Sequence, residues 1–252
     1  MVGAPVVWSL VTGAPAPLQR LVLAVDGPSG SGKSSVSRRV ARVLGLGVLD
    51  TGAMYRAVTC AALDRGLDLA DADAVAALAR AAQLEQSLDP ERESVVIDGT
   101  DVTTAIREPR VSAAVSAVAT NLAVREELVA RQRAVAASGG VVIEGRDITT
   151  VVAPDAPVRI LLTADEGARV ARRARELHGT ADAQALAATQ DLVVLRDARD
   201  STVAAFTTAA EGVVEIDTSA LGFDEVVQAV LDVVVARVPE AAAVLHPAEA
   251  AR

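Results

Sequence analysis

Short apolar segments alternate with amphipathic segments along most of the chain. Short β-like runs, mostly apolar, occupy residues 21–25, 141–145 and 158–162, and two weaker runs occupy 47–50 and 213–217. Continuous runs of this kind are typical of parallel strands covered on both faces, because neither face of such a strand meets water. We therefore expect an α/β fold in which a five-stranded parallel sheet is flanked by helices.

Helical periodicity fills most of the intervals between these runs. Val36, Val40, Val43 and Leu44 fall on one face of a helix after the first run, and Gly45 stands where that helix would stop. The same period predicts further helices at 52–65, 72–82, 109–137, 165–177, 184–200 and 223–237.

Three segments differ from this alternation. Residues 84–107 carry a Pro turn, a short VVID strand and a Gly turn, which predict a small β-rich insert. Residues 1–19 lack a basic region before their broken apolar run, so we expect a disordered extension and not a signal peptide. Residues 239–252 are Ala-rich and predict a flexible tail. The predicted folded domain therefore spans 20–238.

Composition narrows the class of protein. The chain is 51% hydrophobic and 23% charged, as in a globular domain, and its net charge of −9 argues against a general nucleic-acid-binding surface. Cys60 is the single cysteine, which excludes an intramolecular disulfide and suits a reducing cytoplasm. No segment approaches the roughly 18 consecutive apolar residues that a membrane span requires.

Residues 21–35 have the pattern of a strand, a glycine-rich loop and a helix start. Gly27, Gly32, Lys33 and Ser34 satisfy GxxxxGK[ST]. In such a loop the backbone N–H groups surround phosphate oxygens, and the helix N-terminus adds a partial positive charge. The predicted ATP-binding residues are Gly27, Pro28, Ser29, Gly30, Ser31, Gly32, Lys33, Ser34 and Ser35.

Lys33 is the only lysine in the chain, which otherwise uses arginine for its fixed cations. Its compact charge on a flexible stem reaches the β- and γ-phosphates, where a planar guanidinium would be too bulky. Ser34 is the expected Mg²⁺ ligand. A regulatory GTPase is excluded, because its Asn-Lys-x-Asp guanine reader is missing: the single Asn, Asn121, precedes Leu.

Other polar residues cluster at predicted strand ends. LDTGAMYR (49–56) ends one strand and opens a helix, while VVIEGRD (141–147) ends another. Glu144 is a candidate to hold Mg²⁺ through water, and Arg146 and Asp147 lie at the carboxyl edge of the sheet, where ligands bind in such folds.

An arginine series follows toward the C-terminus. Arg169, Arg172 and Arg173 fall close together on one predicted helix, a repulsive cluster unless they share an anion. For Arg172 and Arg173, beside the flexible HGTADAQ stretch, the spacing favours a lid over a triphosphate. For Arg169 a solvated helix face explains the position equally well.

These motifs together resemble the bacterial cytidylate kinases. GPSGSGKSS, LDTGAMYR, VREELVARQR, EGRDITTVVAPDAPVRILLTA and RDARDST follow in uninterrupted order within residues 21–237. The resemblance implies a P-loop kinase core, a nucleoside-monophosphate-binding region with the β-rich insert at 84–107, and an arginine-bearing lid at about 165–200. It further implies transfer of phosphate from ATP, with Mg²⁺, to CMP and dCMP, by a monomer.

The resemblance also assigns roles to particular residues. Lys33, Arg172 and Arg173 would be catalytic. The residues expected to face cytosine are Thr51, Ser116, Arg125 and Asp147; those expected at the acceptor phosphate are Arg56 and Arg146, with Arg107 nearby; those expected at the sugar are Arg196 and Asp200. For Thr51 and Ser116 an ordinary helix-capping or packing hydroxyl is the alternative.

The chain departs from the family pattern at several positions. Val203 stands where the family has an arginine of the acceptor-binding set, and Thr207-Thr208 stand where it has Pro-Leu. Thr149, Ala153 and Leu122 replace the usual Gly, Phe and Pro. Two alternatives therefore stay open at this point: a P-loop kinase with a changed small-molecule acceptor, and a catalytically weak nucleotide-binding paralogue.

Overall fold

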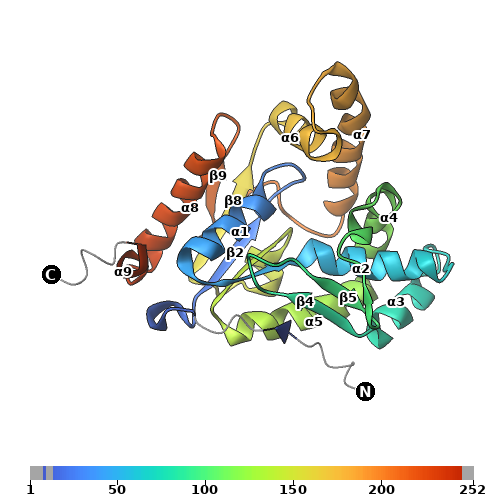
Figure 1. The fold of residues 1–252 in the computed structure, drawn as a ribbon, viewed down its shortest axis with the longest axis horizontal. Coiled ribbons are helices and arrows are strands. Elements are labelled where there is room, and N and C mark those ends of the chain that lie inside the picture. The colour runs from blue at the N-terminus through green and yellow to red at the C-terminus, as the bar shows by residue number, and fades with distance from the viewer. Residues whose placement is uncertain (1–7, 10–13, 246–252) are drawn as a thin grey trace.

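A five-stranded parallel sheet forms the centre of the computed structural model, which describes residues 8–9 and 14–245 (Figure 1). The order across the sheet is β3-β7-β2-β8-β9. The bounds of its strands are β2 Val22–Asp26, β3 Gly47–Asp50, β7 Val141–Gly145, β8 Val158–Thr163 and β9 Val214–Asp217. Each expected apolar run is confirmed as a strand to within a residue or two.

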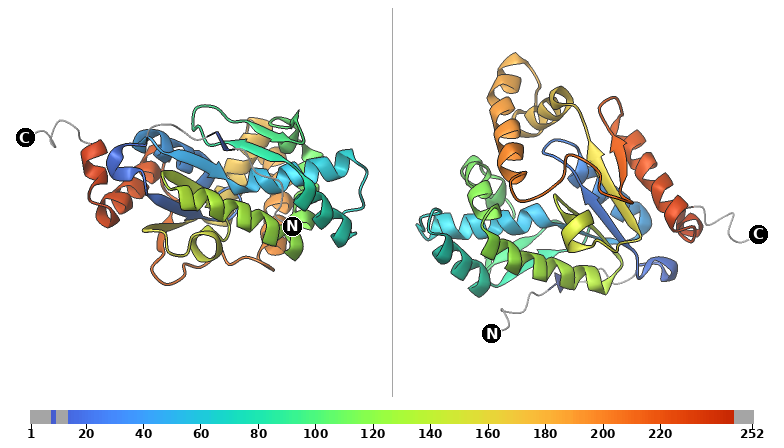
Figure 2. Two further views of the ribbon diagram at one scale, coloured as in Figure 1. Left: turned by 90° about the horizontal axis from the view of Figure 1, so that it is seen from below. Right: turned by 180° about the vertical axis from the view of Figure 1, so that it is seen from behind.

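The central strand β2 is apolar on both faces up to Asp26 because helices cover both sides of the sheet. Leu23 and Val25 of β2 pack on the side of α1 and α8, whereas Ala24 between them packs on the side of α2 and α5. Figure 2 shows these two groups of helices on opposite sides of the sheet. Successive side chains of a strand point to opposite faces, so both positions must be apolar here.

Nine α-helices occur within the described residues. Their bounds are α1 Lys33–Leu44, α2 Thr51–Asp64, α3 Ala72–Ala81, α4 Pro109–Ala119, α5 Leu122–Ser138, α6 Glu166–His178, α7 Ala183–Asp200, α8 Phe223–Arg237 and α9 Ala241–Leu245. Shorter helical segments are the 3₁₀-helices η1 Ala16–Leu18 and η2 Ala105–Arg107 and the π-helix η3 Ile148–Val152.

The helical pattern over 109–137 is divided between α4 and α5. Asn121 causes the division, since its side chain accepts hydrogen bonds from the backbone N–H groups of Ala123 (3.0 Å) and Val124 (3.3 Å). An Asn in this position starts a new helix, because it satisfies N–H groups that have no partner within the helix.

The β-rich insert is present as a second, smaller sheet. Its strands are β4 Leu84–Ser87, β5 Val95–Ile97 and β6 Thr100–Asp101, which pair antiparallel, and the short β1 Trp8–Ser9 pairs parallel to β4. Asp98 and Gly99, both at positive φ, make the tight turn between β5 and β6. Helices α6 and α7, in the segment for which a lid was expected, pack on each other and rise above the sheet edge (Figure 1); this helix pair is called the lid below.

Residues on both sides of the expected boundaries at 20 and 238 pack against the core. Leu18 is fully buried in the core beside α1, and the ring of Pro15 lies close to Gly45. Beyond 238, α9 packs on α1 and α8, with Ala241 fully buried. These few apolar side chains were overlooked because the Gly, Pro and Ala around them suggest loop. Residues 1–7, 10–13 and 246–252 of the predicted extension and tail lie outside the described residues.

None of the helices in the described part of the chain combines the length and the hydropathy needed to cross a membrane.

Leu18→Ala tests whether residues 14–19 belong to the domain. The substitution removes a fully buried side chain from the core, so we expect the free energy of unfolding to fall by about 2–5 kcal/mol in denaturant titrations. Gln19→Ala, at an exposed neighbour, is the control and should change little. An unchanged stability in Leu18→Ala would mean that this segment is not packed.

Candidate functional site

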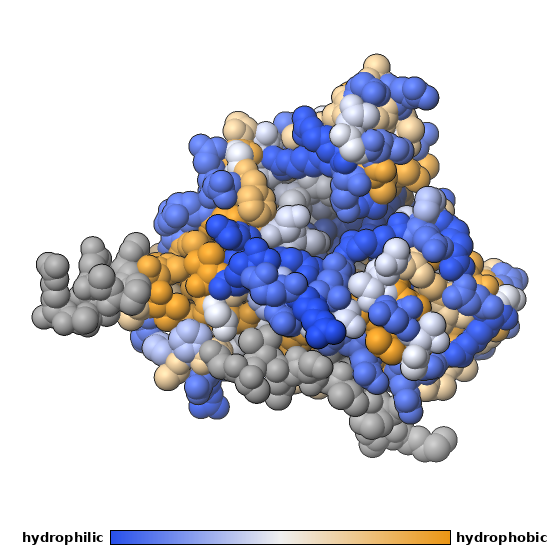
Figure 3. Space-filling view, in the orientation of Figure 1, coloured by the Kyte–Doolittle hydropathy of each residue, from blue (hydrophilic) through white to orange (hydrophobic). Residues whose placement is uncertain are grey.

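A cavity of about 760 Å³ opens at the carboxyl ends of the sheet strands, between the lid, the core and the insert. Its mouth is bordered by hydrophilic side chains beneath the lid (Figure 3). Most of the residues predicted from sequence line it: residues 29–35, Thr51, Arg56, Arg107, Arg125, Arg146, Asp147, Arg172, Arg173, Arg196 and Asp200. Gly27, Pro28 and Ser116 lie just outside this lining.

The glycine-rich loop is shaped by close packing on both sides. A Cβ on Gly27 would lie 2.4 Å from the carbonyl oxygen of Leu162 in β8. Gly30 and Gly32 have φ of +77° and +89°, in the left-handed region that favours glycine, and a Cβ on Gly30 would lie 2.4 Å from the carbonyl oxygen of Arg169 in the lid. The loop therefore fits between the sheet and the lid only with glycine at these places.

Lys33 begins α1 and points back over the loop. Its Nζ lies 3.4 Å from the carbonyl oxygen of Pro28. Burial, together with the nearby charge of Arg146, lowers the pKa of Lys33 to about 8, while the carboxylate of Glu144 opposes both effects. A phosphate anion at this ammonium would relieve the cost of burying it.

Ser34 and two carboxylates form an oxygen-rich corner next to Lys33. The Ser34 hydroxyl donates to Glu144 Oε1 at 2.5 Å. Burial, with the nearby carboxylate of Asp50, raises the pKa of Glu144 to about 7. A divalent cation would offset this repulsion between carboxylates. Mg²⁺ takes one or two carboxylates together with substrate phosphates and waters, so these oxygens suit it.

Arg125 and Asp147 form an ion pair at the far end of the cavity. Both side chains are largely buried, and burial raises the pKa of Asp147 although Arg125 counteracts it. Tyr55 lines the same end, where burial raises its pKa to about 12. This end thus offers a buried acceptor beside a buried donor, the arrangement needed to recognise a polar ring edge.

The hydroxyls of Thr51 and Ser116 already donate within the protein. Thr51 Oγ1 donates to the backbone oxygen of Glu144 at 2.8 Å, and Ser116 Oγ donates to Asp200 Oδ1 at 3.1 Å. Both contacts therefore fit the alternative that these hydroxyls serve in packing within the protein. Thr51 still faces the cavity, whereas Ser116 lies behind Asp200.

Three arginines have a buried Nε atom without a hydrogen-bond partner in the described part of the chain: Arg56, Arg169 and Arg196. Of these, Arg56 and Arg196 line the cavity. The Arg196 Nε lies 3.5 Å from Asp200 Oδ2, as an ion pair whose geometry makes no hydrogen bond. Burial lowers the pKa of Arg56, and burial together with the charges of Arg56 and Arg146 lowers that of Arg196 to about 9. Cations gathered in this way call for an anion between them.

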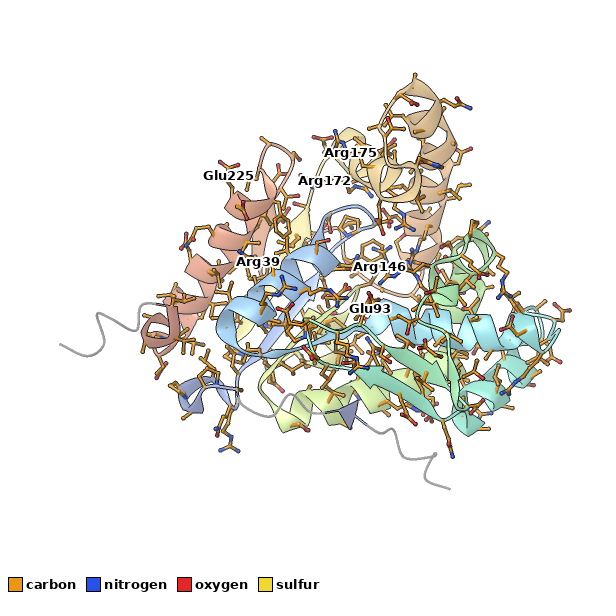
Figure 4. The ribbon with its side chains drawn as sticks, in the orientation of Figure 1. Arg39, Glu93, Arg146, Arg172, Arg175 and Glu225 are labelled. Carbon is orange, nitrogen blue, oxygen red and sulfur yellow. The ribbon has the colours of Figure 1, made fainter. Side chains whose placement is uncertain are left out.

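Three further arginines of the cavity lining, Arg107, Arg172 and Arg173, also have protein partners. Arg172 donates to the hydroxyl (2.8 Å) and backbone oxygen (2.5 Å) of Thr218, so it points from α6 toward the loop after β9 (Figure 4). Arg173 pairs with Glu176 of its own helix at 2.5 Å, and Arg107 pairs with Glu93 of the insert. Arg172 would have to leave Thr218 to reach a triphosphate.

Sequence reasoning missed Asp26, whose carboxylate holds the loop after Asp147. It accepts from the backbone N–H groups of Ile148 (2.8 Å) and Thr149 (2.8 Å) and from the Thr149 hydroxyl (2.6 Å). Burial raises the pKa of Asp26 to about 6. Thr149, one of the departures from the family pattern, therefore adds an anchor that Gly could not supply.

Asp197 and Phe206 were also missed. Asp197 contacts the glycine-rich loop, and Phe206 stacks over Arg146 with its ring centroid 4.4 Å from the guanidinium carbon. The signal for Asp197 was present in RDARD, which carries two carboxylates, but only the second was singled out. Nothing in the local sequence marks Phe206, because its contact is made across the fold.

Comparison with known proteins agrees with this geometry. A model of the cytidylate kinase family matches residues 23–236. The chain belongs to the cytidylate kinase family. It is 53% identical over 85% of its length to a cytidylate kinase of Cutibacterium acnes, of which the match covers 96%. It is 49% identical over 85% of its length to that of Rhodococcus opacus, with 94% of the relative covered. It is 43% identical over 88% of its length to that of Streptomyces avermitilis, with 96% covered.

Val203 is the departure that bears most directly on the site of this kinase. It lines the cavity, beside Ala204, where the family pattern has an arginine. The Nε atoms of Arg56 and Arg196 remain as buried donors in the same cavity.

Gly30→Ala tests the contact between loop and lid. The new Cβ would strain the backbone at positive φ and collide with the carbonyl of Arg169. We expect the affinity for ATP, measured by calorimetry, to fall by about tenfold or more, because about 1.4 kcal/mol of lost contact is a factor of ten.

Gly66→Ala is the matched control. Gly66 has φ of +66° and nothing within 4 Å of its Cβ position, so it carries the same backbone strain without the collision. Equal ATP affinities in the two variants would show that the loop does not depend on its contact with the lid.

Proposed function

We propose that this protein transfers the γ-phosphoryl group of ATP to CMP, and to dCMP, forming ADP and the cytidine diphosphate. The observation that carries the proposal is the pair of unpartnered, buried guanidinium nitrogens of Arg56 and Arg196 in the same cavity as the glycine-rich loop. One part of the cavity can thus hold the phosphates of a donor, and another can hold the phosphate of an acceptor.

The donor side consists of residues 27–35. Backbone N–H groups of this loop and the start of α1 would surround the β- and γ-phosphates, and Lys33 would bring its charge to them. Ser34 and Glu144 would hold Mg²⁺, which neutralises phosphate charge when bound. The Ser34 hydroxyl and the Glu144 carboxylate lie 2.5 Å apart beside the loop, so one cation could contact both groups.

The acceptor side would bind the three parts of CMP separately. Arg56 and Arg146, with Arg107 nearby, would hold the phosphate, and Arg196 and Asp200 the sugar. The charge of Arg196, which is felt at Arg56 and Arg146, would also favour the phosphate anion. Asp147 would accept from the exocyclic amine of cytosine while Arg125 donates to the ring acceptors. Uracil has a carbonyl where cytosine has the amine, so it would face the Asp147 carboxylate with a second acceptor.

Transfer then requires no covalent enzyme intermediate. A phosphate oxygen of CMP attacks the γ-phosphorus in line, and the bond from that phosphorus to the bridging oxygen of ADP breaks. Lys33, with Arg172 and Arg173 once the lid arginines turn inward, would stabilise the charge on the transferring group. Closure of the lid would exclude water and so suppress ATP hydrolysis.

A wider set of properties belongs to the same proposal. We infer that the enzyme acts as a monomer in the cytoplasm, requires Mg²⁺ and binds no nucleic acid. The net charge of −9 supports the last point, since nucleic-acid surfaces are basic.

A panel of nucleoside monophosphates tests the proposal directly. With ATP and Mg²⁺ in a coupled assay for ADP release, we expect CMP and dCMP to give the highest kcat/KM. Efficient use of another acceptor, with none of CMP, would replace the proposal by a kinase with a changed acceptor. ATP binding without transfer to any acceptor would indicate a nucleotide-binding paralogue.

Asp147→Asn tests base recognition. The amide would offer a donor where the carboxylate only accepts, which suits the carbonyl of uracil. We expect the ratio of kcat/KM for CMP to that for UMP to fall by about tenfold or more, since a hydrogen bond to a charged group contributes about 1.5–3 kcal/mol. Asp155→Asn, at an exposed position, is the control. A ratio that stays the same in Asp147→Asn would remove Asp147 from base recognition.

A further inference from the structure

One carboxylate connects the donor loop, the lid and the acceptor arginine. Asp197, near the end of α7, accepts from the backbone N–H of Ser29 at 3.0 Å and lies 3.0 Å from Nη2 of Arg146. Its other oxygen pairs with Arg169 of α6. Only 13% of the Asp197 side chain is exposed, so these contacts form in a poorly solvated environment where charge-assisted bonds are strong.

Two residues of the lid form hydrogen bonds with the backbone of Ser29, one with its N–H and one with its carbonyl oxygen. Asp197 takes the N–H, and Arg169 Nη1 donates to the Ser29 carbonyl oxygen at 3.1 Å. The backbone of Arg169 also packs directly against Gly30. Arg169 is therefore not on a solvated helix face, and the glycine-rich loop and the lid form one connected unit through this residue and Asp197.

Arg146 is the acceptor-side member of the same network. Its Nη1 donates to the Gly27 carbonyl oxygen and its Nε to Asp200, each at 2.8 Å, while Phe206 covers its face. Figure 4 shows Arg146 between the lid and the helices below it. Asp197 holds Arg146 with one oxygen and Arg169 with the other. A movement of Arg169 that shifts the Asp197 carboxylate therefore also disturbs its contact with Arg146, and the reverse holds as well.

We propose that Asp197 is a positioning residue that couples the two substrate sites, so that occupation of the ATP site tightens the binding of CMP. The proposal rests on the proposed function, since it needs both substrates to bind. ATP would order residues 27–35, and with them Ser29. Asp197 would then be held in place to orient Arg146 toward the acceptor phosphate. By linkage, CMP tightens ATP by the same factor.

A role that is only structural makes a different prediction from coupling. If Asp197 merely stabilised the lid, its loss would weaken each ligand by a factor that does not depend on the other ligand. Coupling predicts that the ratio between the two affinities of CMP changes. That ratio is the quantity to measure.

Calorimetry with a non-hydrolysable ATP analogue gives the ratio. The Kd of CMP is measured without and with saturating analogue, in the full chain. We expect the analogue to tighten CMP by about fivefold or more in the parent, within the usual range of coupling free energies, and by less than about twofold in Asp197→Asn. Asn cannot accept equally with two oxygens and brings an N–H₂ group against Arg146 or Arg169.

Two further variants make the result decisive. Asp191→Asn removes a carboxylate from the exposed surface of the same helix and should keep the ratio of the parent. Arg169→Gln keeps the Asp197 carboxylate but removes its ion pair with α6. In this variant too, the analogue should tighten CMP by less than about twofold. Arg169→Gln decides the question if Asp197→Asn does not fold.

The outcomes separate the two proposals. A parent that binds no CMP with or without the analogue contradicts the proposed function. If the parent binds CMP equally well with and without the analogue, the coupling is contradicted and the proposed function stands. The same holds if Asp197→Asn and Arg169→Gln both keep the parent's ratio of CMP affinities.

Discussion

The site depends on the burial of several cations without enough protein anions to balance them. Lys33, Arg56 and Arg196 all have pKa values lowered by burial, and for each of them the charge of a neighbouring arginine adds to the effect. Such a cluster is costly in the free protein, because desolvated charges of like sign repel. Bound phosphate groups relieve this repulsion. The fold therefore contributes to substrate binding by holding the cations close together before the substrate arrives.

The fold makes this concentration of charge possible by placing chain segments that are distant in sequence at one sheet edge. Parallel strands β2, β3 and β7 end at the same edge, and each leads directly into polar residues: the glycine-rich loop, Asp50-Thr51 and Arg146-Asp147. Helix α7 then supplies Arg196, Asp197 and Asp200 from above. Carboxylates in this second layer, especially Asp197 and Asp200, orient the arginines without neutralising all of them.

Sequence predicted the parts that local patterns encode. The five strands, the glycine-rich loop and the insert follow from apolar runs and turn residues, and they are present. The folded segment at Leu18 and helix α9 were missed, because their burial depends on a surface formed by distant helices. The tethering of Arg172 to Thr218 and of Arg146 to Asp197 could not be predicted either, since an arginine's partner depends on tertiary placement and not on spacing along one helix.

The affinity of CMP compared with that of cytidine tests the central claim most directly. The two ligands share base and sugar and differ only in the phosphate that the buried arginines are proposed to receive. Charged hydrogen bonds of about 1.5–3 kcal/mol correspond to about 10–100-fold in Kd, so calorimetry should find CMP tighter than cytidine by at least that factor. In Arg56→Gln the advantage should shrink while cytidine binds as before. Equal affinities of the parent for CMP and cytidine would contradict the account, because the arginines would then be buried for some reason other than a phosphate.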